Sequence, residues 1–370
     1  MALTTVSSER LSTNVKTSNL GTELKGKIGQ NKNLISNGAM NVAQRGTSST
    51  GLGASAGYFT LDRYRTTFNS TAGRLTMSQV ADVHDGFANA MKFECTTADT
   101  SIGASEYFIL QQKIEGQDLQ QLKKGSSDAE QLTVSFYVKG NASATYVAEL
   151  YDLDNNRQVG KTFSVTTSWT RVVLTFPADT TGALDDDNNA SLQLGIWLHA
   201  GSNYTSGTLA TSWIANVSAQ RAGGITSFFD STDRTFFLTG LQMEVGSVAT
   251  DFEHRSFGED LNHCKRYFQR HNENGKFTGN TSYYRSGSIE TQFKFEPEMR
   301  ATPTFSAASG TNYYYFYRNN GFDNFNSWGS TNAMGQRGGA VNASTSSASN
   351  GEAGAMYVNT GGTLHFSADL

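Results

Sequence analysis

The chain contains 370 residues, of which 37 are glycine and 3 are proline, and charged residues make up 17%. Its surface is therefore built largely from serine, threonine, asparagine and glutamine, a composition typical of a β-protein and not of a helical bundle. The formal net charge of −4 is weak and has the wrong sign for phosphate-backbone binding, which excludes nucleic acid as the main partner.

No stretch of about 18 consecutive apolar residues occurs, so we expect no insertion into a membrane. The N-terminal segment lacks the basic-then-apolar layout of a secretory signal, which predicts a chain made without Sec export. The two cysteines, Cys95 and Cys264, fall in segments that we assign to different domains, so we expect no disulfide. Stability must then come from buried side chains, many of them aromatic rings.

Residues 1–32 alternate Ser, Thr, Asn and Lys with isolated Leu, Val and Ile. Such a segment is too sparse in apolar residues to bury a core of its own. Chain termini stay loose unless something holds them, so we expect this N-terminal arm to dock onto another chain.

Residues 33–256 show a period of two, the period of a β-strand. Leu132, Val134, Phe136 and Val138 alternate with residues that are mostly polar, which puts an apolar row on one face. Short strands separated by turn clusters predict a jelly-roll β-sandwich. The predicted strands are Leu132–Val138, Tyr146–Tyr151, Lys161–Val165, Trp169–Phe176, Leu192–His199, Trp213–Val217 and Phe236–Val245.

Residues 257–272 carry the signals of a helix. Ser256 and Glu259 fit a capping box, and basic residues follow toward the end, so we predict a helix from Phe257 to His271. Its apolar stripe, Leu261, Cys264 and Phe268, suits packing on a sheet or on symmetry-related copies. A simple linker helix that packs on its own domain explains the stripe equally well.

Residues 273–370 return to strands and predict a smaller C-terminal β domain. Gly329–Gly354 is rich in Gly, Ser, Asn and Ala and is interpreted as a long loop or weak strands. The predicted fold is thus all-β: a jelly-roll β-sandwich, a short helix and a smaller C-terminal β domain. The distal strands are predicted at Ile289–Phe295, Tyr313–Tyr317, Ala355–Val358 and Leu364–Phe366.

Motifs for cofactor and metal binding are weak, and we predict neither a cofactor nor a bound metal ion. Gly51–Gly57 has its last glycine one place too late for a dinucleotide loop. Asp152–Asn156 and Asp185–Asn189 resemble the start of a calcium loop, but both lack its later glycine and glutamate, so we interpret them as hairpin turns. Metal-ligand spacing is absent from the six histidines, His84, His199, His254, His263, His271 and His365.

Motifs for catalysis are weak as well, so we expect that the protein is not an enzyme. Cys264 lies on the predicted helix stripe, where a thiol is usually part of the core and not a nucleophile. Paired carboxylates depend on space and not on spacing, so they stay possible. The candidates are Glu94, Glu106, Glu149 and Glu244.

Aromatic residues give a further lead in the distal domain. Alternation puts Tyr313, Tyr315 and Tyr317 on one face of a strand, and Trp328 follows in a loop rich in glycine and asparagine. Such rings could stack on the apolar faces of sugars, which makes these four residues candidates for receptor binding. A packed sheet or a trimer interface explains them too.

Several segments carry a resemblance to a known class of proteins. Asn33–Asn41 (NLISNGAMN), followed by Tyr58–Tyr64 (YFTLDRY), resembles the opening of the jelly-roll domain of bacteriophage tail fibres and also resembles carbohydrate-binding modules. Phe237–Phe268 is similar to a junction seen in many phage tail-fibre and virion proteins. Phe295–Thr304 and Leu364–Leu370 look like the C-terminal domain of the same proteins.

This resemblance implies a homotrimeric, non-enzymatic protein of the virion tail, made in the host cytoplasm. It implies binding to a host-surface glycan, and attachment through residues 1–32 to a tail adaptor or another virion protein. Carbohydrate-binding modules often hold a structural calcium ion near the first strand, but Ala39, Met40 and Asn41 do not support one here. Two alternatives stay open: a structural or capsid-decorating virion protein without receptor affinity, and a polysaccharide depolymerase.

Overall fold

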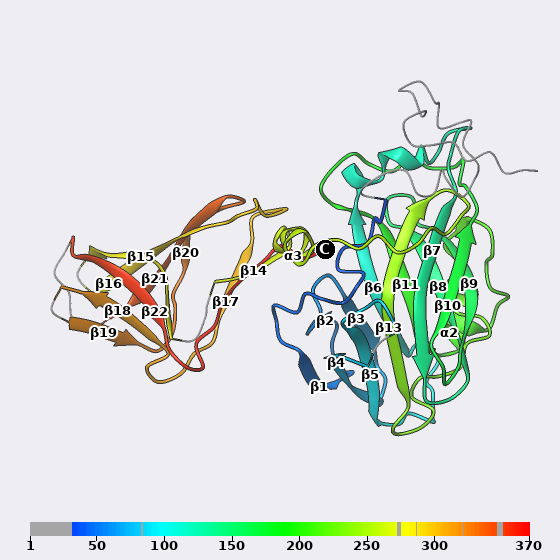
Figure 1. The fold of residues 1–370 in the computed structure, drawn as a ribbon, viewed down its shortest axis with the longest axis horizontal. Coiled ribbons are helices and arrows are strands. Elements are labelled where there is room, and N and C mark those ends of the chain that lie inside the picture. The colour runs from blue at the N-terminus through cyan, green and yellow to red at the C-terminus, as the bar shows by residue number, and fades with distance from the viewer. Residues whose placement is uncertain (1–31, 83, 272–274, 286, 320, 346–350) are drawn as a thin grey trace, which may run out of the picture.

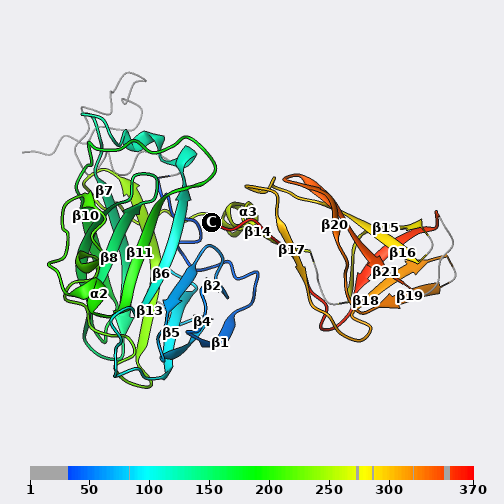
Figure 2. The same ribbon diagram turned by 180° about the vertical axis from the view of Figure 1, so that it is seen from behind.

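The computed structural model describes residues 32–82, 84–271, 275–285, 287–319, 321–345 and 351–370. The chain forms two β lobes along its long axis, with the helix α3 (Phe257–Lys265) between them (Figures 1 and 2). The predicted N-terminal arm lies outside the described residues, except for Lys32. None of the helices in the described part of the chain combines the length and the apolar character that a membrane crossing needs.

The larger lobe is a sandwich of two antiparallel sheets, a jelly-roll arrangement. The first sheet has the strand order β1 (Ser48–Leu52), β4 (Arg74–Val80), β5 (Ala90–Thr97), β13 (Thr235–Val245), β7 (Leu132–Gly140) and β10 (Thr170–Phe176). The second has the order β12 (Ile214–Ala215), β9 (Arg157–Val165), β8 (Ala144–Asp152), β11 (Ala190–Ala200), β6 (Tyr107–Glu115), β3 (Arg65–Asn69) and β2 (Gly57–Tyr58).

One hydrophobic core lies between these two sheets. Val134, Phe136 and Val138 of β7 are fully buried in it, as the alternation predicted. The predicted strands of this lobe are all present, although the one expected at 213–217 is reduced to the two residues of β12. β13 pairs with β7 through a register shift, and Gly240 there has a φ of +60°, a conformation that favours glycine.

α3 begins as predicted but ends earlier. Ser256 and Glu259 form both hydrogen bonds of a capping box. The predicted end at His271 is wrong, because the helix stops at Lys265 and the chain continues as the strand β14 (Phe268–Arg270). Short helical turns elsewhere are η3 (Gly116–Asp118), η4 (Gln120–Leu122), α2 (Ser202–Thr205) and η5 (Ser218–Gln220).

The smaller lobe contains two antiparallel sheets around a second core. A three-stranded sheet next to α3 has the order β14, β23 (Leu364–Ser367) and β17 (Thr304–Ala307). The distal sheet has the order β19 (Gly321–Phe325), β18 (Tyr314–Arg318), β22 (Ala353–Val358), β15 (Lys276–Arg285), β16 (Ser288–Lys294), β21 (Gly338–Ser344) and β20 (Thr331–Gly335).

The glycine-rich tract 329–354 contains strands, one of the two structures expected for it. β20 and β21 pair within it, while residues 346–350 lie outside the described part. The all-β prediction is confirmed: a jelly-roll sandwich, a short helix and a smaller β lobe follow one another along the chain.

Buried ion pairs and hydrogen bonds join the two lobes. The carboxylate of Glu115, fully buried at the end of β6, accepts two hydrogen bonds from Arg266, at 2.7 and 2.6 Å, and one from the hydroxyl of Tyr267. The Arg300 guanidinium donates to the carbonyl of Asn188 at 2.8 Å, and the Asn188 amide donates back to the Arg300 carbonyl at 2.7 Å. The lobes are therefore held together by side chains that follow α3 in the sequence and bond to the larger lobe.

Candidate functional site

A cleft of about 210 Å³ lies on the outer face of the seven-stranded sheet, the face turned away from the main core. Its lining combines strands β6, β8 and β11 with the segment that follows β11. We call it the outer cleft, and its lining residues are Tyr107, Ile109, Gln111, Tyr151, Leu153, Gln193, Trp197, Tyr204 and Arg221.

Strand alternation determines which side chains face the outer cleft. On β11, Leu194 and Ile196 point into the core between the sheets, so Gln193 and Trp197 point outward. The same alternation on β6 turns Gln111 outward. The alternation of side chains along β6 and β11 therefore determines which residues form the floor of the cleft.

The segment 201–226 covers part of this outer face and supplies one side of the cleft. It is anchored by Ala222, which is fully buried in a small cluster with Trp197 and whose N–H donates to the Tyr204 carbonyl at 2.9 Å. This anchoring brings Arg221 next to the strands, and it holds Tyr204, which follows β11 closely in the sequence, against the same face.

A buried carboxylate fixes the polar side of the cleft. Glu149, 1% exposed, accepts hydrogen bonds from Arg221 Nε at 2.8 Å, from Arg221 Nη2 at 2.7 Å and from Trp197 Nε1 at 2.9 Å. Burial alone lowers the pKa of Arg221, but the hydrogen bonds to Glu149 outweigh it and the pKa is raised. The guanidinium also lies 4.5 Å from the ring centre of Tyr151, so Arg221 is held in one place.

Three tyrosines leave part of their rings open to the cleft. Tyr107, Tyr151 and Tyr204 are half-buried, and the Tyr107 and Tyr204 ring centres are 5.3 Å apart and nearly perpendicular. Trp197 is fully buried, and its ring packs against that of Tyr204 with 5.3 Å between the ring centres. Burial raises the pKa of the Tyr151 and Tyr204 hydroxyls, so both stay protonated near neutral pH. The Tyr151 hydroxyl already donates to Asn156 Oδ1, so the Tyr204 hydroxyl is the one that can donate to a ligand.

Two glutamine amides in the cleft have hydrogen-bonding capacity to spare. Gln111 Oε1 accepts from the Thr67 hydroxyl at 2.8 Å, which orients the amide and leaves its NH₂ group available. The Gln193 amide makes no side-chain hydrogen bond within the described residues. Half-exposed rings beside free amides can bind a neutral ligand that has both apolar faces and many hydroxyl groups.

The sequence-predicted receptor residues do not form one surface. Tyr315 and Tyr317 lie on the outer face of the distal sheet, while Tyr314 and Phe316 are buried in the core, so the predicted two-faced strand is confirmed. With neighbouring strands they form the distal aromatic patch, whose members have ring centres 5.2 to 6.2 Å apart: Phe277, Tyr315, Tyr317, Phe322 and Tyr357.

Tyr313 and Trp328 lie elsewhere. Both are half-buried and pack against the distal core, and Tyr313 precedes β18. Trp328 borders a shallow polar groove that also contains Asn312 and Asn326. The structure therefore separates Tyr313 and Trp328 from the exposed patch.

The predicted junction residues pack within the chain itself. Cys264 is fully buried and Leu261 is half-buried on α3, as expected for an apolar stripe. Phe268 is buried too, but it lies in β14 with the Arg45 guanidinium 3.6 Å from its ring centre. Cys95 and Cys264 are both free thiols.

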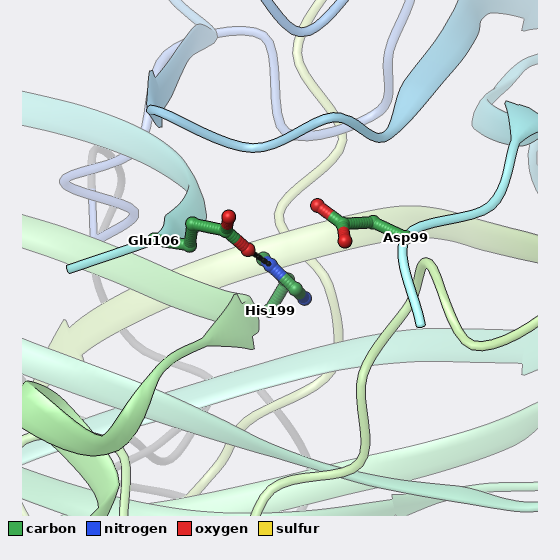
Figure 3. A group of neighbouring side chains, drawn as sticks. All are labelled: Asp99, Glu106 and His199. Atoms are coloured by element: carbon green, nitrogen blue, oxygen red, sulfur yellow. Dashed lines mark ion pairs between the residues drawn. The ribbon is translucent and has the colours of Figure 1, made fainter. Parts of the chain in front are cut away.

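The four candidate carboxylates have different surroundings. Glu149 binds Arg221, Glu94 pairs with Lys92, and Glu244 Oε1 accepts from the Thr250 N–H at 2.8 Å. Glu106 instead lies close to Asp99 and His199 (Figure 3).

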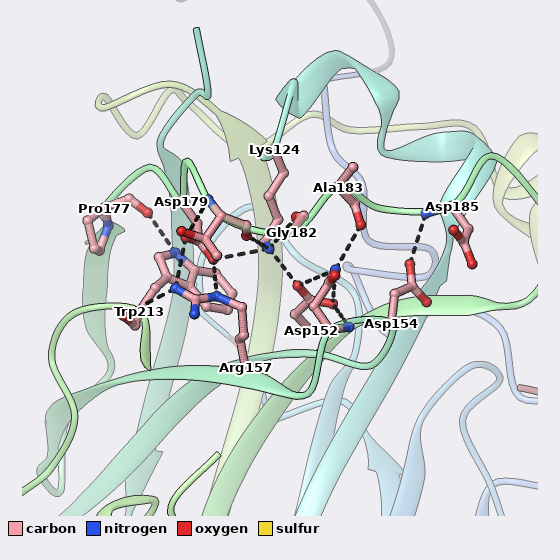
Figure 4. A network of polar contacts seen from close by, with 12 residues as sticks. Lys124, Asp152, Asp154, Arg157, Pro177, Asp179, Gly182, Ala183, Asp185 and Trp213 are labelled. Carbon is pink, nitrogen blue, oxygen red and sulfur yellow. Dashed lines mark hydrogen bonds and ion pairs between the residues drawn. The ribbon is translucent and has the colours of Figure 1, made fainter. Parts of the chain in front are cut away.

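The two calcium-like segments are held by their own side chains. Asp152 accepts from the Asn155 N–H at 2.9 Å in the turn between the paired strands β8 and β9, which confirms the hairpin predicted there. Asp187 accepts from the Asn189 N–H at 2.8 Å, but its segment joins β10 and β11, which belong to different sheets, so the hairpin predicted at 185–189 is wrong. The Lys124 ammonium donates to Asp152, and lies 3.0 Å from Asp179 (Figure 4). The Lys124 ammonium thus occupies the space between the carboxylates of Asp152 and Asp179.

Sequence reasoning missed the outer cleft, although part of its signal was present. The alternation that predicts β11 also predicts that Gln193 and Trp197 face away from the core. Tyr204 and Arg221 carried no such signal, because they lie in α2 and just after η5, short helical turns whose position against the sheet depends on the folded chain.

No protein-family model matches the chain, and no curated protein matches it in sequence. Solved structures of similar fold include a CBM4 carbohydrate-binding module (13% identity, 57% of this chain and 99% of that chain, TM-score 0.30). They also include the enzymatically active domain of tailspike protein 4 of bacteriophage CBA120 (11%, 58% and 21%, 0.32) and the family 11 carbohydrate-binding module of the cellulase Lic26A-Cel5E of Clostridium thermocellum (12%, 56% and 98%, 0.26). At such identities and TM-scores, no ligand or activity carries over to this chain.

Proposed function

We propose that this protein binds a carbohydrate in the outer cleft. The observation that carries the proposal is the proximity of half-exposed tyrosine rings to the available NH₂ group of Gln111 and to the amide of Gln193. A sugar ring presents C–H groups on its faces and hydroxyls around its edge, so it can stack on the rings while it hydrogen-bonds to the amides. The Glu149–Arg221 pair keeps the site in shape before the ligand arrives.

We propose further that the chain is a phage tail-fibre protein that attaches the virion to a host-surface glycan as a homotrimer. The sequence resemblance of residues 33–41, 237–268 and 295–304 supports this assignment. The cleft is small, so each site should bind weakly, and several copies on one particle would multiply that weak affinity. Residues 1–32 are assigned to attachment to a tail adaptor or another virion protein.

The distal aromatic patch is proposed as the surface that meets a second copy of the chain. Phe277 is 61% exposed and Phe322 is 53% exposed, which is unusual for large apolar rings that lie together. Contact between copies would remove these rings from water and would supply part of the trimer's stability.

Glycan-array binding of the purified full chain tests the carbohydrate site. We expect Tyr204→Ala and Gln193→Ala each to weaken binding at least about tenfold, since each removes a stacking or hydrogen-bonding group. Tyr284→Ala is the matched control, because Tyr284 is 69% exposed on the distal sheet. Equal binding by wild type and both cleft variants would overturn the assignment.

The same samples separate the two alternative functions, a virion protein without receptor affinity and a polysaccharide depolymerase. A chain found in purified particles that binds no glycan and no host cell would be a structural or decorating protein. New reducing ends after incubation with host polysaccharide would identify a depolymerase.

Light scattering coupled to size exclusion tests the homotrimer. We expect the mass of three chains for wild type and a lower mass for Phe322→Ser, which makes the patch polar. A single-chain mass for wild type at micromolar concentration would contradict the homotrimer, whatever the glycan result.

A further inference from the structure

Three potential metal ligands meet where the ends of β5, β6 and β11 come close together. Asp99 follows β5, Glu106 directly precedes β6, and His199 lies near the end of β11 (Figure 3). Their ligand atoms all lie within 4.8 Å of one another. We call these three residues the His199 group.

Asp99 and His199 each already have hydrogen-bond contacts with neighbouring groups outside the His199 group. Asp99 Oδ2 accepts hydrogen bonds from the Thr71 hydroxyl and from the Ala72 N–H, both at 2.8 Å, which leaves Oδ1 for another partner. His199 Nδ1 lies 2.8 Å from the Ser227 hydroxyl. When Nδ1 carries the proton and donates it to Ser227, Nε2 presents its lone pair to the carboxylates.

The atoms that face one another in the His199 group lack hydrogen bonds. His199 is 0% exposed, yet its Nε2 has no hydrogen-bond partner, and the buried Glu106 Oε2 has none either. The two atoms are 3.5 Å apart. Unsatisfied polar atoms are costly in a protein interior, and facing lone pairs repel each other, so a cation between them would remove both penalties.

We propose that Asp99, Glu106 and His199 bind one structural Zn²⁺ ion. Tetrahedral zinc with bonds of about 2.1 Å places its ligands roughly 3.4 Å apart, which matches the 3.5 Å between His199 Nε2 and Glu106 Oε2. Separations of up to 4.8 Å must shorten by at most about 1.4 Å, which small movements of these side chains can supply. One imidazole and two carboxylates leave the fourth position to water.

Zinc suits this ligand set better than calcium does. Imidazole nitrogen is a common ligand for zinc, whereas calcium takes six to eight oxygen ligands. The Thr71, Ala72 and Ser227 contacts supply the outer shell that orients zinc ligands in proteins. The bound ion would fasten the loop before β6 to the end of β11, and Tyr107 of the outer cleft directly follows Glu106.

Zinc titration of the untagged, chelator-treated full chain tests the proposal. We expect about one Zn²⁺ per chain and a rise in melting temperature on binding. We expect Glu106→Gln and Asp99→Asn to weaken zinc binding by at least tenfold, because both keep the side-chain shape and lose the ligand charge. Cobalt, used as a visible probe, should give a tetrahedral absorption spectrum that Glu106→Gln removes.

The controls are Glu94→Gln and His254→Gln, a carboxylate and an exposed histidine outside the His199 group. Both should bind zinc as wild type does. The proposal fails if wild type binds no zinc, if Glu106→Gln and Asp99→Asn bind it unchanged, or if calcium binds at these residues in place of zinc. Because the readout is metal binding, its failure is separate from failure of the glycan site.

Discussion

Lys124 shows how one side chain can replace a metal ion. Its ammonium donates to the Asp152 carboxylate and to the carbonyls of Thr181 and Gly182, at 2.9 and 2.8 Å, and it lies 3.0 Å from Asp179 (Figure 4). Burial alone raises the pKa of Asp179, but hydrogen bonds from Arg157 and Lys124 outweigh it and the pKa is lowered. The positive charge thus stabilises two buried carboxylates.

Replacing Lys124 should therefore be costly. Lys124→Met keeps much of the side-chain volume but leaves Asp152, whose side chain is 0% exposed, without its cation. We expect a loss of roughly 3–5 kcal/mol in the free energy of unfolding, the range for a broken buried ion pair. Urea denaturation measures this loss.

The neighbouring Lys123→Met is the matched control. Lys123 is 56% exposed and lies 3.6 Å from Glu130, which is also exposed. Exposed pairs contribute little, so we expect a change within about 0.5 kcal/mol. Equal losses for the two variants would show that the buried position of Lys124 has no special role.

At the scale of elements, two half-buried histidines make the small sheet next to α3 sensitive to acid. Burial lowers the pKa of His271 from 6.5 to about 4, with Lys265 adding to the effect, and burial likewise lowers the pKa of His365 to about 4. The His271 ring lies 5.2 Å from that of Phe366, and the His365 ring lies 5.2 Å from that of Phe268. Both rings are therefore uncharged near neutral pH.

These shifts predict that stability falls as the pH falls. Between about pH 6.5 and 4 the unfolded chain binds more protons than the folded chain, so stabilisation present above that window is lost within it. We expect a loss of roughly 1–2 kcal/mol per ring, less than the full shift implies, because both rings are only partly buried. Thermal melts across this range measure it.

The double variant His271→Gln, His365→Gln should show a flatter pH dependence than wild type. His254→Gln, in which an exposed histidine is changed, should keep the wild-type slope. Comparing slopes removes the constant cost of each substitution. Identical slopes in all three proteins would contradict the assignment.

Elements with clear periodicity were predictable from the sequence, and those set by long-range contacts were not. The β7 strand was predictable because its alternation is complete over residues 132–138. The end of α3 was not, because Arg266 and Tyr267 reach across to Glu115, and the chain then pairs with β23. Local helix signals cannot report a partner that lies so far away in the sequence.

At the scale of the whole molecule, Glu115 is the main link between the lobes. The hydrogen bonds that Arg266 donates to the Glu115 carboxylate raise the pKa of Arg266, which keeps its guanidinium charged. We expect Glu115→Gln to lower stability by about 1–3 kcal/mol and to speed hydrogen exchange in α3, because the amide is a weaker acceptor and carries no charge.

Glu298→Gln is the matched control for this link. Glu298 pairs with Arg337 at 3.0 Å, but that arginine side chain is 86% exposed, so its loss should not affect α3. Unchanged exchange in α3 of Glu115→Gln would mean that other contacts hold the lobes together.

The functional sites follow the same division between local and long-range information. Alternation gave the two faces of β18, and so predicted that Tyr315 and Tyr317 lie together. The His199 group could not be found from spacing, because β11 pairs with β6 only in the folded sheet and brings His199 beside Glu106. The outer cleft likewise joins separate segments, and only the fold brings them together.

The position of Leu370 has a practical consequence. Its carbonyl accepts a hydrogen bond from the Tyr58 hydroxyl at 2.7 Å, and Asp369 pairs with Arg45, so this end of the chain lies at the waist between the lobes (Figure 1). A fluorescent protein or gold label fused after Leu370 would mark the middle of the molecule in a micrograph. A probe meant for the outer tip has to be inserted in a turn of the distal sheet.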